Sequence, residues 1–336
     1  MKLGRIKVLG ADGTVGRIVA VHPDERRVVD LALAEVLRLM SRGATESAAR
    51  RYAAALFPES MSAAIALGDL FLESAKQADA MKGTEASLPI EKVTWLPATD
   101  PSVVRDCLTF PLHIKQVSER VGAKINPLIF EIPGYFKGPP STVVGHDAEI
   151  PYPFYSEYLD YELEIGFVVG HAGHNLTPEE AEKCIFGLTV FNDFSARDRQ
   201  GKEIPLGMGP QKSKDFAYGI GPWITTMDEF DGIDNLEMVA RVNGEEWGRG
   251  VSKDMIWSPG ELLAYISIGE QLQPGDLFGS GTVGNGSAFE LGRRLNPGDV
   301  IELEISGVGV LRNRIGPAEK KRWWPTPRKN PFDTTA

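Results

Sequence analysis

The sequence predicts a mainly β protein that begins with a small α+β region, and three observations support this. The 336 residues include 36 glycines and 23 prolines, residue types that concentrate in the turns between short strands. From residue 93 onward, short runs of apolar and β-branched residues alternate with turn residues, which is typical of strands. Between residues 31 and 81, alanine and leucine instead recur at helical spacing. We therefore expect a small α+β domain at residues 1–95 and a β-rich domain at residues 96–336.

The composition excludes several classes of protein. With 42% hydrophobic residues, the chain can bury a sizeable core in one large or two ordinary domains. A formal net charge of −10 argues against a nucleic-acid-binding surface, and it means that an anionic substrate would need a local positive centre. Cys107 and Cys184 have no CxxC spacing, so neither a disulfide framework nor a zinc–thiolate site is expected. The sequence shows no membrane span and no signal-peptide core, so we expect a cytoplasmic protein that does not contact membranes.

The first 95 residues are predicted to form a small β-meander followed by helices. Strands are expected at residues 6–9, 17–21 and 27–31, with a turn at residues 10–13. Helices are expected at residues 31–40, 48–56 and 61–81, and a linker or surface loop at residues 82–95. We assign no chemistry to this part, and its one histidine, His22, is expected to be exposed.

The remaining residues are predicted to be rich in strands. These are expected at residues 93–97, 161–170, 185–193, 222–226, 236–242, 262–268 and 300–305. Thr177 and Pro178 predict a short helix at residues 178–184, and Pro-Gly-Asp at 274–276 and 297–299 predicts hairpin turns. Residues 126–153 are expected to be irregular and residues 320–336 to form an extended arm.

Two glutamates open the strand at residues 161–170. Alternate side chains leave the same face of a strand, so Glu162 and Glu164 point the same way and lie roughly 6–7 Å apart along the strand. Such a pair can bind one hard divalent cation through its oxygens. The alternative is that both side chains lie on a solvated face of the sheet.

Other residues could complete a site. Asp193 ends an apolar strand, where it could be a third ligand or a helix cap. Asp106 and His113 stand seven residues apart around an apolar segment, and His113 alone would more often be a core histidine.

Further motifs make the pattern specific. In order and spacing, residues 161–164 (YELE), 191–200 (FNDFSARDRQ), 212–213 (KS), 221–223 (GPW) and 281–284 (GTVG) resemble the fumarylacetoacetate hydrolase superfamily. The resemblance covers most of residues 95–315. It implies a twisted β-roll of mixed sheets, usually assembled as a homodimer, and the strand pattern fits that fold.

The resemblance also implies a metal site. Four carboxylates would bind one divalent cation, with Mg²⁺ expected first and Mn²⁺ or Ca²⁺ as alternatives: Asp106, Glu162, Glu164 and Asp193. Residues 126–153 depart from the hydrolase pattern, and no clear match there supplies an arginine for the substrate carboxylate.

Catalytic and substrate-binding roles follow from the same resemblance. Five side chains would act in catalysis: His113 as the base that activates water, Glu290 as the carboxylate that orients it, and Arg197, Gln200 and Lys212 as donors to the oxyanion. Three would contact the substrate: Tyr135, Thr282 and Lys137, the last in place of the missing arginine. Lys214 competes with Lys212, but the spacing from Gly221-Pro222 favours Lys212.

These residue types suit one kind of chemistry. Cleavage of a carbon–carbon bond beside a carbonyl needs an enolate to be stabilised, which a divalent metal can do, and a neutral histidine can activate water. We therefore expect metal-dependent hydrolysis of a β-diketo acid, fumarylacetoacetate- or acylpyruvate-like, through a metal-bound enolate, in the catabolism of aromatic or related compounds. The alternatives are a decarboxylase, tautomerase or hydratase of a 2-oxo acid on the same site, and a metal-binding protein without turnover. The expected partners are a small oxo or diketo acid and a second copy of the chain.

Overall fold

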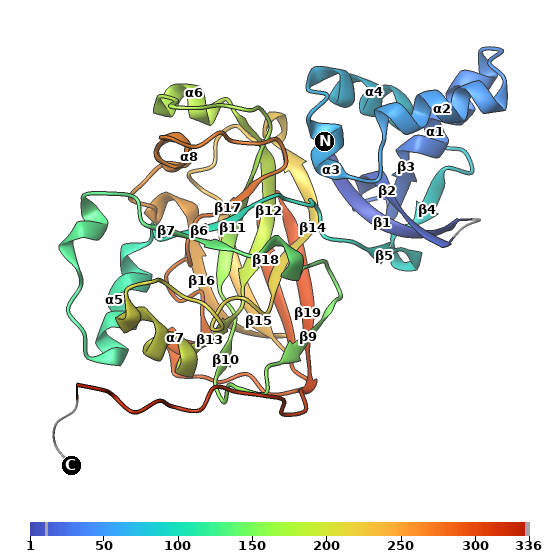
Figure 1. Ribbon diagram of the computed structural model, residues 1–336. Helices are drawn as coiled ribbons and strands as arrows, with labels where there is room; N and C mark the ends of the chain where they lie inside the picture. Colours follow the sequence, from blue (N-terminus) through green and yellow to red (C-terminus); the bar gives the residue numbers. More distant parts are fainter. Residues whose placement is uncertain (11–12, 333–336) are drawn as a thin grey trace.

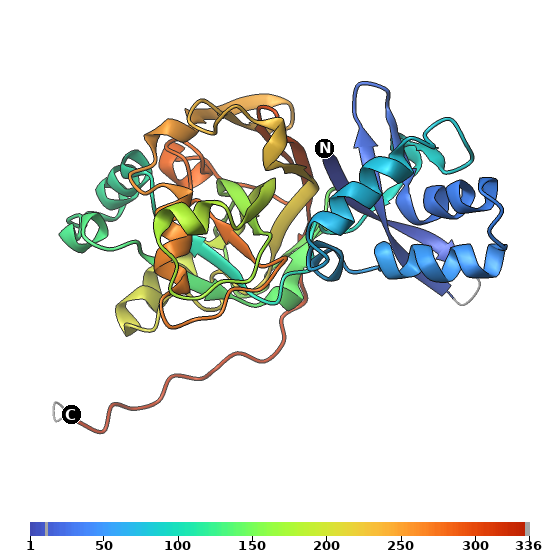
Figure 2. The ribbon, with the colours of Figure 1, turned by 90° about the horizontal axis from the view of Figure 1, so that it is seen from above.

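The first 95 residues form a β-meander covered by helices, which is the smaller lobe of the computed structural model (Figures 1 and 2). The structure describes residues 1–10 and 13–332. This lobe contains β1 (Lys2–Gly10), β2 (Gly13–His22), β3 (Arg27–Asp30), α1 (Leu31–Ser41), α2 (Glu46–Leu56), α3 (Met61–Ile65), α4 (Asp69–Asp79), β4 (Ser87–Pro89) and β5 (Thr94–Trp95).

The predicted meander is confirmed, with two differences. The helix expected at residues 61–81 is divided into α3 and α4, because the chain takes a positive φ of 61° at Gly68. The expected linker at residues 82–95 contributes β4 and β5, which pair with β3 and β1. The turn expected at residues 10–13 includes residues 11 and 12, which lie outside the described residues.

The larger lobe consists mainly of strands. They are β6 (Val104–Cys107), β7 (Tyr135–Gly138), β8 (Val143–Val144), β9 (Glu149–Tyr152), β10 (Leu159–Asp160), β11 (Leu163–Val169), β12 (Ile185–Asp193), β13 (Ser195–Ala196), β14 (Tyr218–Thr226), β15 (Glu237–Val242), β16 (Glu245–Val251), β17 (Leu277–Gly279), β18 (Val300–Ile305) and β19 (Gly309–Ala318). The helices of this lobe are α5 (Pro111–Val121), α6 (Pro178–Glu182), α7 (Arg197–Glu203), α8 (Pro259–Ser267) and α9 (Ala288–Leu291). Short 3₁₀ turns include Pro127–Phe130 and Ile204–Leu206.

One sheet of 12 strands runs through both lobes. Its main path is β4-β3-β2-β1-β14-β12-β11-β17-β6-β7, and the junction between the lobes is the antiparallel pair β1–β14. A second sheet, β16-β15-β18-β19-β9, lies in the larger lobe. Both sheets contain antiparallel and parallel pairs, the parallel ones including β17–β6 and β19–β9. The predicted β-rich roll of mixed sheets, preceded by a small α+β lobe, is therefore confirmed.

Two apolar segments of the larger lobe form helices. The strand expected at residues 262–268 is helix α8, which begins with a capping box between Ser258 and Glu261. Its apolar residues are buried almost all round, and such a short apolar run has no periodicity that separates a buried helix from a strand. Strand β6 ends at Cys107, and the apolar segment that follows leads into α5, so His113 lies on a helix. The short helix expected after Thr177 is confirmed as α6.

The two lobes share a hydrophobic core. One cluster of buried side chains contains Leu3 and Phe71 of the smaller lobe together with Val168 and Phe191 of the larger one. Phe71 stacks on Phe186, with ring centroids 6.3 Å apart. None of the helices in the described residues is long and apolar enough to span a membrane.

Candidate metal centre and active site

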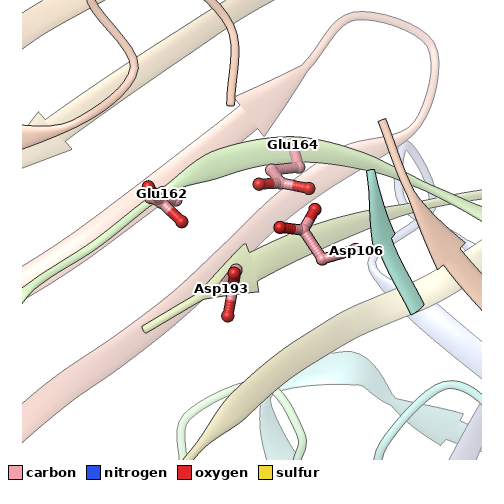
Figure 3. A group of neighbouring side chains, drawn as sticks. All are labelled: Asp106, Glu162, Glu164 and Asp193. Carbon is pink, nitrogen blue, oxygen red and sulfur yellow. The ribbon is translucent and has the colours of Figure 1, made fainter. Parts of the chain in front are cut away.

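Four buried carboxylates meet in the middle of the larger lobe. Asp106, Glu162, Glu164 and Asp193 each offer an oxygen, and these four oxygens lie within 4.8 Å of one another. Figure 3 shows the four side chains converging from neighbouring strands. Their exposed fractions are 8%, 3%, 0% and 0%, so the solvated face considered for the glutamate pair is wrong.

The sheet explains why these residues meet. β11 pairs with β12 so that Leu163 lies opposite Asn192, which brings the start of one strand to the end of the other. Glu162 precedes β11, and its backbone N–H donates to Asn192 Oδ1 (3.1 Å). On the other side of β11, β17 carries Gly279 beside Asp106 of β6.

Glycine at position 279 makes room for the third carboxylate. A Cβ atom there would lie 2.4 Å from Glu164 Oε2 and 2.7 Å from the Phe191 ring. Glu164 Oε2 instead accepts the backbone N–H of Gly281 (3.0 Å), and its Oε1 accepts the hydroxyl of Thr282 (3.3 Å). The absence of a side chain on β17 thus allows a glutamate to be buried in the sheet.

Burial and mutual repulsion raise the pKa values of three of these four carboxylates. Burial raises the pKa of Asp106, and burial together with the charge of Asp106 raises the pKa of Glu164 well above its ordinary value. Burial also raises the pKa of Asp193 well above its ordinary value, against the charge of Lys214. Burial acts in the same direction on Glu162, but the charges of Arg197 and Lys214 outweigh it and hold the pKa of Glu162 well below its ordinary value.

Two buried cations offset part of this negative charge. The ammonium of Lys214 contacts Glu162 Oε2 and Asp193 Oδ2. Arg197 donates from Nη2 to Glu162 Oε1 and from Nε to Asp160 Oδ2, both at 2.7 Å. Asp160 is itself fully buried, so five carboxylates face two cations.

The excess negative charge and the carboxylate oxygens without a hydrogen-bond partner fit a divalent cation. Asp106 Oδ1 and Asp193 Oδ1 are buried without a hydrogen-bond partner among the described residues, although buried polar atoms are almost always paired. Oxygen-only ligand sets of this kind suit Mg²⁺, Mn²⁺ or Ca²⁺. The four clustered carboxylates would hold such an ion, and its charge would remove the repulsion among them.

A histidine and a carboxylate stand beside the cluster. His113 Nδ1 lies 3.1 Å from Glu290 Oε1, and His113 Nε2 lies 3.8 Å from Glu162 Oε1. Glu290 is fixed by the backbone N–H of Asn285 (3.1 Å) and by the backbone N–H and hydroxyl of Ser287 (both 2.8 Å). The imidazole thus lies between two carboxylates, with Nδ1 beside Glu290 and Nε2 on the side of Glu162.

A cavity of about 450 Å³ opens over these groups. Predicted site residues that line it are Asp106, His113, Tyr135, Glu162, Arg197, Gln200 and Thr282, together with Lys214. Glu164, Asp193 and Glu290 lie behind this surface through the contacts described above. Gln200 stands one turn after Arg197 on α7 and accepts from its Nη1 (3.0 Å), as their spacing predicted.

Two of the predicted site residues lie outside the lining of the cavity. Lys212 is 57% exposed at its side chain and pairs with Asp215 (2.6 Å), so the preference for Lys212 over Lys214 was wrong about position. Lys137 is 52% exposed and pairs with Glu270 (2.9 Å), a carboxylate that lies outside the cavity lining.

One buried residue was missed by the sequence analysis. Asp160 accepts from Arg197 and from the backbone N–H groups of Ala288 and Phe289 (2.8 and 3.2 Å). It stands two residues before Glu162, and the alternation that paired Glu162 with Glu164 would also have pointed to it.

Comparisons with known proteins agree with this geometry. A family model described as fumarylacetoacetate (FAA) hydrolase C-terminal matches residues 102–316. Oxaloacetate tautomerase YisK from Bacillus subtilis (strain 168) is 36% identical over 188 residues, which are 55% of this chain and 62% of that protein. The chain thus matches less than two thirds of that relative's length.

Solved structures share the fold over nearly the whole chain. A putative HpcE protein from Mycobacterium smegmatis has a TM-score of 0.70 at 26% identity, covering 94% of this chain and all of that one (100%). Maleylpyruvate hydrolase from Sphingobium sp. SYK-6, in complex with manganese(II) ion and pyruvate, has a TM-score of 0.68 at 19% identity, covering 95% and 100%.

We expect divalent metal to stabilise the protein. At a free Mg²⁺ or Mn²⁺ concentration 100 times the dissociation constant, the free energy of unfolding should rise by about 2.7 kcal/mol, measured as a higher melting temperature that EDTA reverses. The metal binds the ionised carboxylates, and the pKa values of Asp106, Glu164 and Asp193 are raised in the metal-free protein. The gain should therefore grow as pH rises above about 4, the ordinary carboxyl range.

Glu164→Gln should remove most of this metal-dependent gain while the metal-free protein stays folded, because a neutral amide relieves the repulsion. Glu304→Gln, on the exposed face of β18, is the matched control and should keep the full gain. Equal stabilisation of both variants would contradict the assignment.

Proposed function

The chain belongs to the fumarylacetoacetate hydrolase family, and we propose that it is a metal-dependent hydrolase that cleaves a carbon–carbon bond in an acylpyruvate-type 2,4-dioxo acid. The family model covers residues 102–316, which include every residue of the carboxylate cluster. The proposed cofactor is Mg²⁺, with Mn²⁺ as an alternative.

The observation that carries the proposal is the pairing of His113 with Glu290. A carboxylate oxygen 3.1 Å from Nδ1 favours a proton on that nitrogen, which leaves Nε2 as the base. Binding a metal needs no such base, whereas hydrolysis does, because water must lose a proton to attack a carbonyl carbon.

The residues around the cavity suit each step. The bound cation would supply a Lewis acid that polarises the substrate's carbonyl oxygens. His113 Nε2 takes a proton from water, whose oxygen adds to the acyl carbonyl carbon, and Glu290 stabilises the resulting imidazolium. Arg197 and Lys214 stabilise the oxyanion electrostatically, and because the carbonyl end of Gln200 accepts from Arg197, its NH₂ end remains to donate.

Collapse of the tetrahedral species completes the reaction. The carbon–carbon bond breaks, its electron pair stays on the leaving carbon as an enolate, and that carbon takes up the proton from His113. The products are pyruvate and a carboxylic acid, so the atoms of one water molecule are consumed in each turnover.

A tautomerase of a 2-oxo acid is the second candidate. It is favoured by the 36% identity to oxaloacetate tautomerase YisK over 188 residues. Keto–enol exchange uses the same carboxylates and cation but moves only a proton, so attack by water is the step that separates the two functions.

Replacing the proposed base should separate the candidates. In His113→Gln, release of pyruvate from an acylpyruvate should fall by about 10²–10⁴, measured with a coupled pyruvate assay. Glu290→Gln should reduce it less, and the double variant should be no slower than His113→Gln, because the two residues act as one unit.

The metal-dependent thermal shift is the control for these variants and should persist in each, since the four ligands are unchanged. Undiminished pyruvate release in His113→Gln would reject the hydrolase mechanism. Keto–enol exchange of oxaloacetate by the wild type, without pyruvate release from any acylpyruvate, would favour the tautomerase.

A pair of lysines two residues apart tests the corrected position of the site. Lys214→Met should lower turnover by about 10²-fold or more, the usual cost of losing an oxyanion donor. Lys212→Met should stay within about twofold of wild type, because Lys212 is exposed and pairs with Asp215. A larger loss in Lys212→Met than in Lys214→Met would contradict this assignment.

We also propose that the chain forms a homodimer. Large apolar side chains of the segment after α5 are exposed: Leu128 (51%), Phe130 (51%) and Ile132 (48%), and such groups are often covered in an assembly. Sedimentation at micromolar concentration should give twice the 36.7 kDa chain mass, and Phe130→Asp should shift the equilibrium toward monomer. A wild-type protein that sediments as a monomer would reject the proposal.

A further inference from the structure

The cavity over the carboxylates has two unlike parts. Its floor is polar and carries the charged groups of the reaction, among them Glu162, Arg197 and Lys214. Its wall is mainly apolar and uncharged and comes from three separate segments, namely α5 with the residues before it, β7, and the stretch after α7: Leu108, Ile114, Val117, Phe136, Ile204 and Pro210. The hydroxyl-bearing residues Ser118 and Tyr135 of the same segments also line the cavity. A substrate whose reacting end lies on the floor therefore extends along an apolar surface.

Each cationic side chain that lines the cavity is already held at the floor. Arg197 contacts Asp160 and Glu162, and Lys214 contacts Glu162 and Asp193. Among the described residues that line the wall, none carries a charge.

The nearest candidates for a second cationic centre are also engaged. Lys137 and the buried Arg105 both pair with Glu270, at 2.9 Å and 2.5 Å, and neither lines the cavity. The wall therefore offers no cationic partner for a carboxylate at the far end of a substrate.

We propose that the substrate is a monocarboxylate, a 2,4-dioxo acid whose acyl group is uncharged and apolar, rather than a dicarboxylate. This rests on the proposed function, because it assigns the dioxo acid end to the floor. It goes further in naming the chemical class of the remaining part, which contacts α5, β7 and the stretch after α7.

Two physical effects act in the same direction. A carboxylate placed against the wall loses hydration without gaining a compensating positive charge, which is unfavourable. It also enters a site in which carboxylates already outnumber cations, so the local field repels it. An alkyl group of the same length instead removes apolar surface from water on both sides.

A matched pair of substrates tests the proposal. Butanoylpyruvate and succinylpyruvate carry acyl groups of four carbons that differ only in a terminal methyl or carboxylate. With the Mg²⁺-loaded full chain, we expect kcat/KM for butanoylpyruvate to be higher by about 10²-fold, the order of discrimination that a pocket of fixed chemistry provides. Equal values, or a preference for succinylpyruvate, would overturn the proposal.

A charge introduced into the wall should reverse the preference. Val117 stands one turn after His113 on α5 and lines the cavity, so Val117→Lys should raise kcat/KM for succinylpyruvate relative to butanoylpyruvate by at least about tenfold. Val121→Lys is the matched control, since Val121 is one turn further along α5, 59% exposed and outside the cavity lining; its substrate preference should equal that of wild type. The same shift in both variants would overturn the assignment of the wall to the acyl group.

Binding measurements keep this test apart from that of the reaction. Calorimetric titration of both acids into Mg²⁺-loaded His113→Gln protein, in which turnover is expected to be slower by about 10²–10⁴, gives their relative affinities. Tighter binding of butanoylpyruvate supports the proposal even if neither acid is hydrolysed, in which case the hydrolase function alone fails. Tighter binding of succinylpyruvate overturns the proposal whether or not hydrolysis occurs.

Discussion

The burial of several carboxylates in one place is the constraint on which the larger lobe depends. Removing an ionised carboxylate from water costs several kcal/mol unless other charges compensate. Here three kinds of compensation are built around the cluster. Hydrogen bonds from Gly281 and Thr282 hold Glu164, and the buried cations Lys214 and Arg197 pair with the carboxylates around it. The third kind would be a divalent cation, which suits the oxygens of Asp106 and Asp193 that have no hydrogen-bond partner among the described residues.

The sequence was sufficient to predict the parts of this arrangement that follow from local periodicity. Alternation along a strand placed Glu162 and Glu164 on one side, and helical spacing placed Arg197 beside Gln200. Strands bounded by turn residues, such as β12 and β18, were predicted with their observed limits. Local periodicity could not decide between Lys212 and Lys214. The loop before β14 has no periodicity, and tertiary contacts alone determine which side chain turns inward.

Contacts between distant segments were beyond the reach of the same reasoning. The pairing of β1 with β14 joins residues more than 200 positions apart, and neither strand carries a local signal that names its partner. Helix α8 was predicted as a strand because its apolar residues face protein on nearly all sides, which removes the polar face that marks a helix in a sequence. In both cases the missing information lies in the packing rather than in the segment.

Helix α5 carries both the proposed base, His113, and part of the apolar wall of the cavity. Three of its residues, spaced three and four apart, contact the segment around α9. His113 faces Glu290, Gln116 exchanges hydrogen bonds with Asn285 (2.7 and 3.2 Å), and Arg120 donates to the backbone carbonyl of Glu290 (3.0 Å). One face of the helix thus fixes the distance between the proposed base and its carboxylate.

The adjoining residues Ile114 and Val117 line the cavity, so the element that positions the base also forms part of the apolar wall. A change that tilts α5 would alter both at once, whereas a change of side chain at Val117 alters the wall alone. The position of the proposed base and the shape of the apolar wall are therefore coupled through the helix axis, although single substitutions can change one without the other.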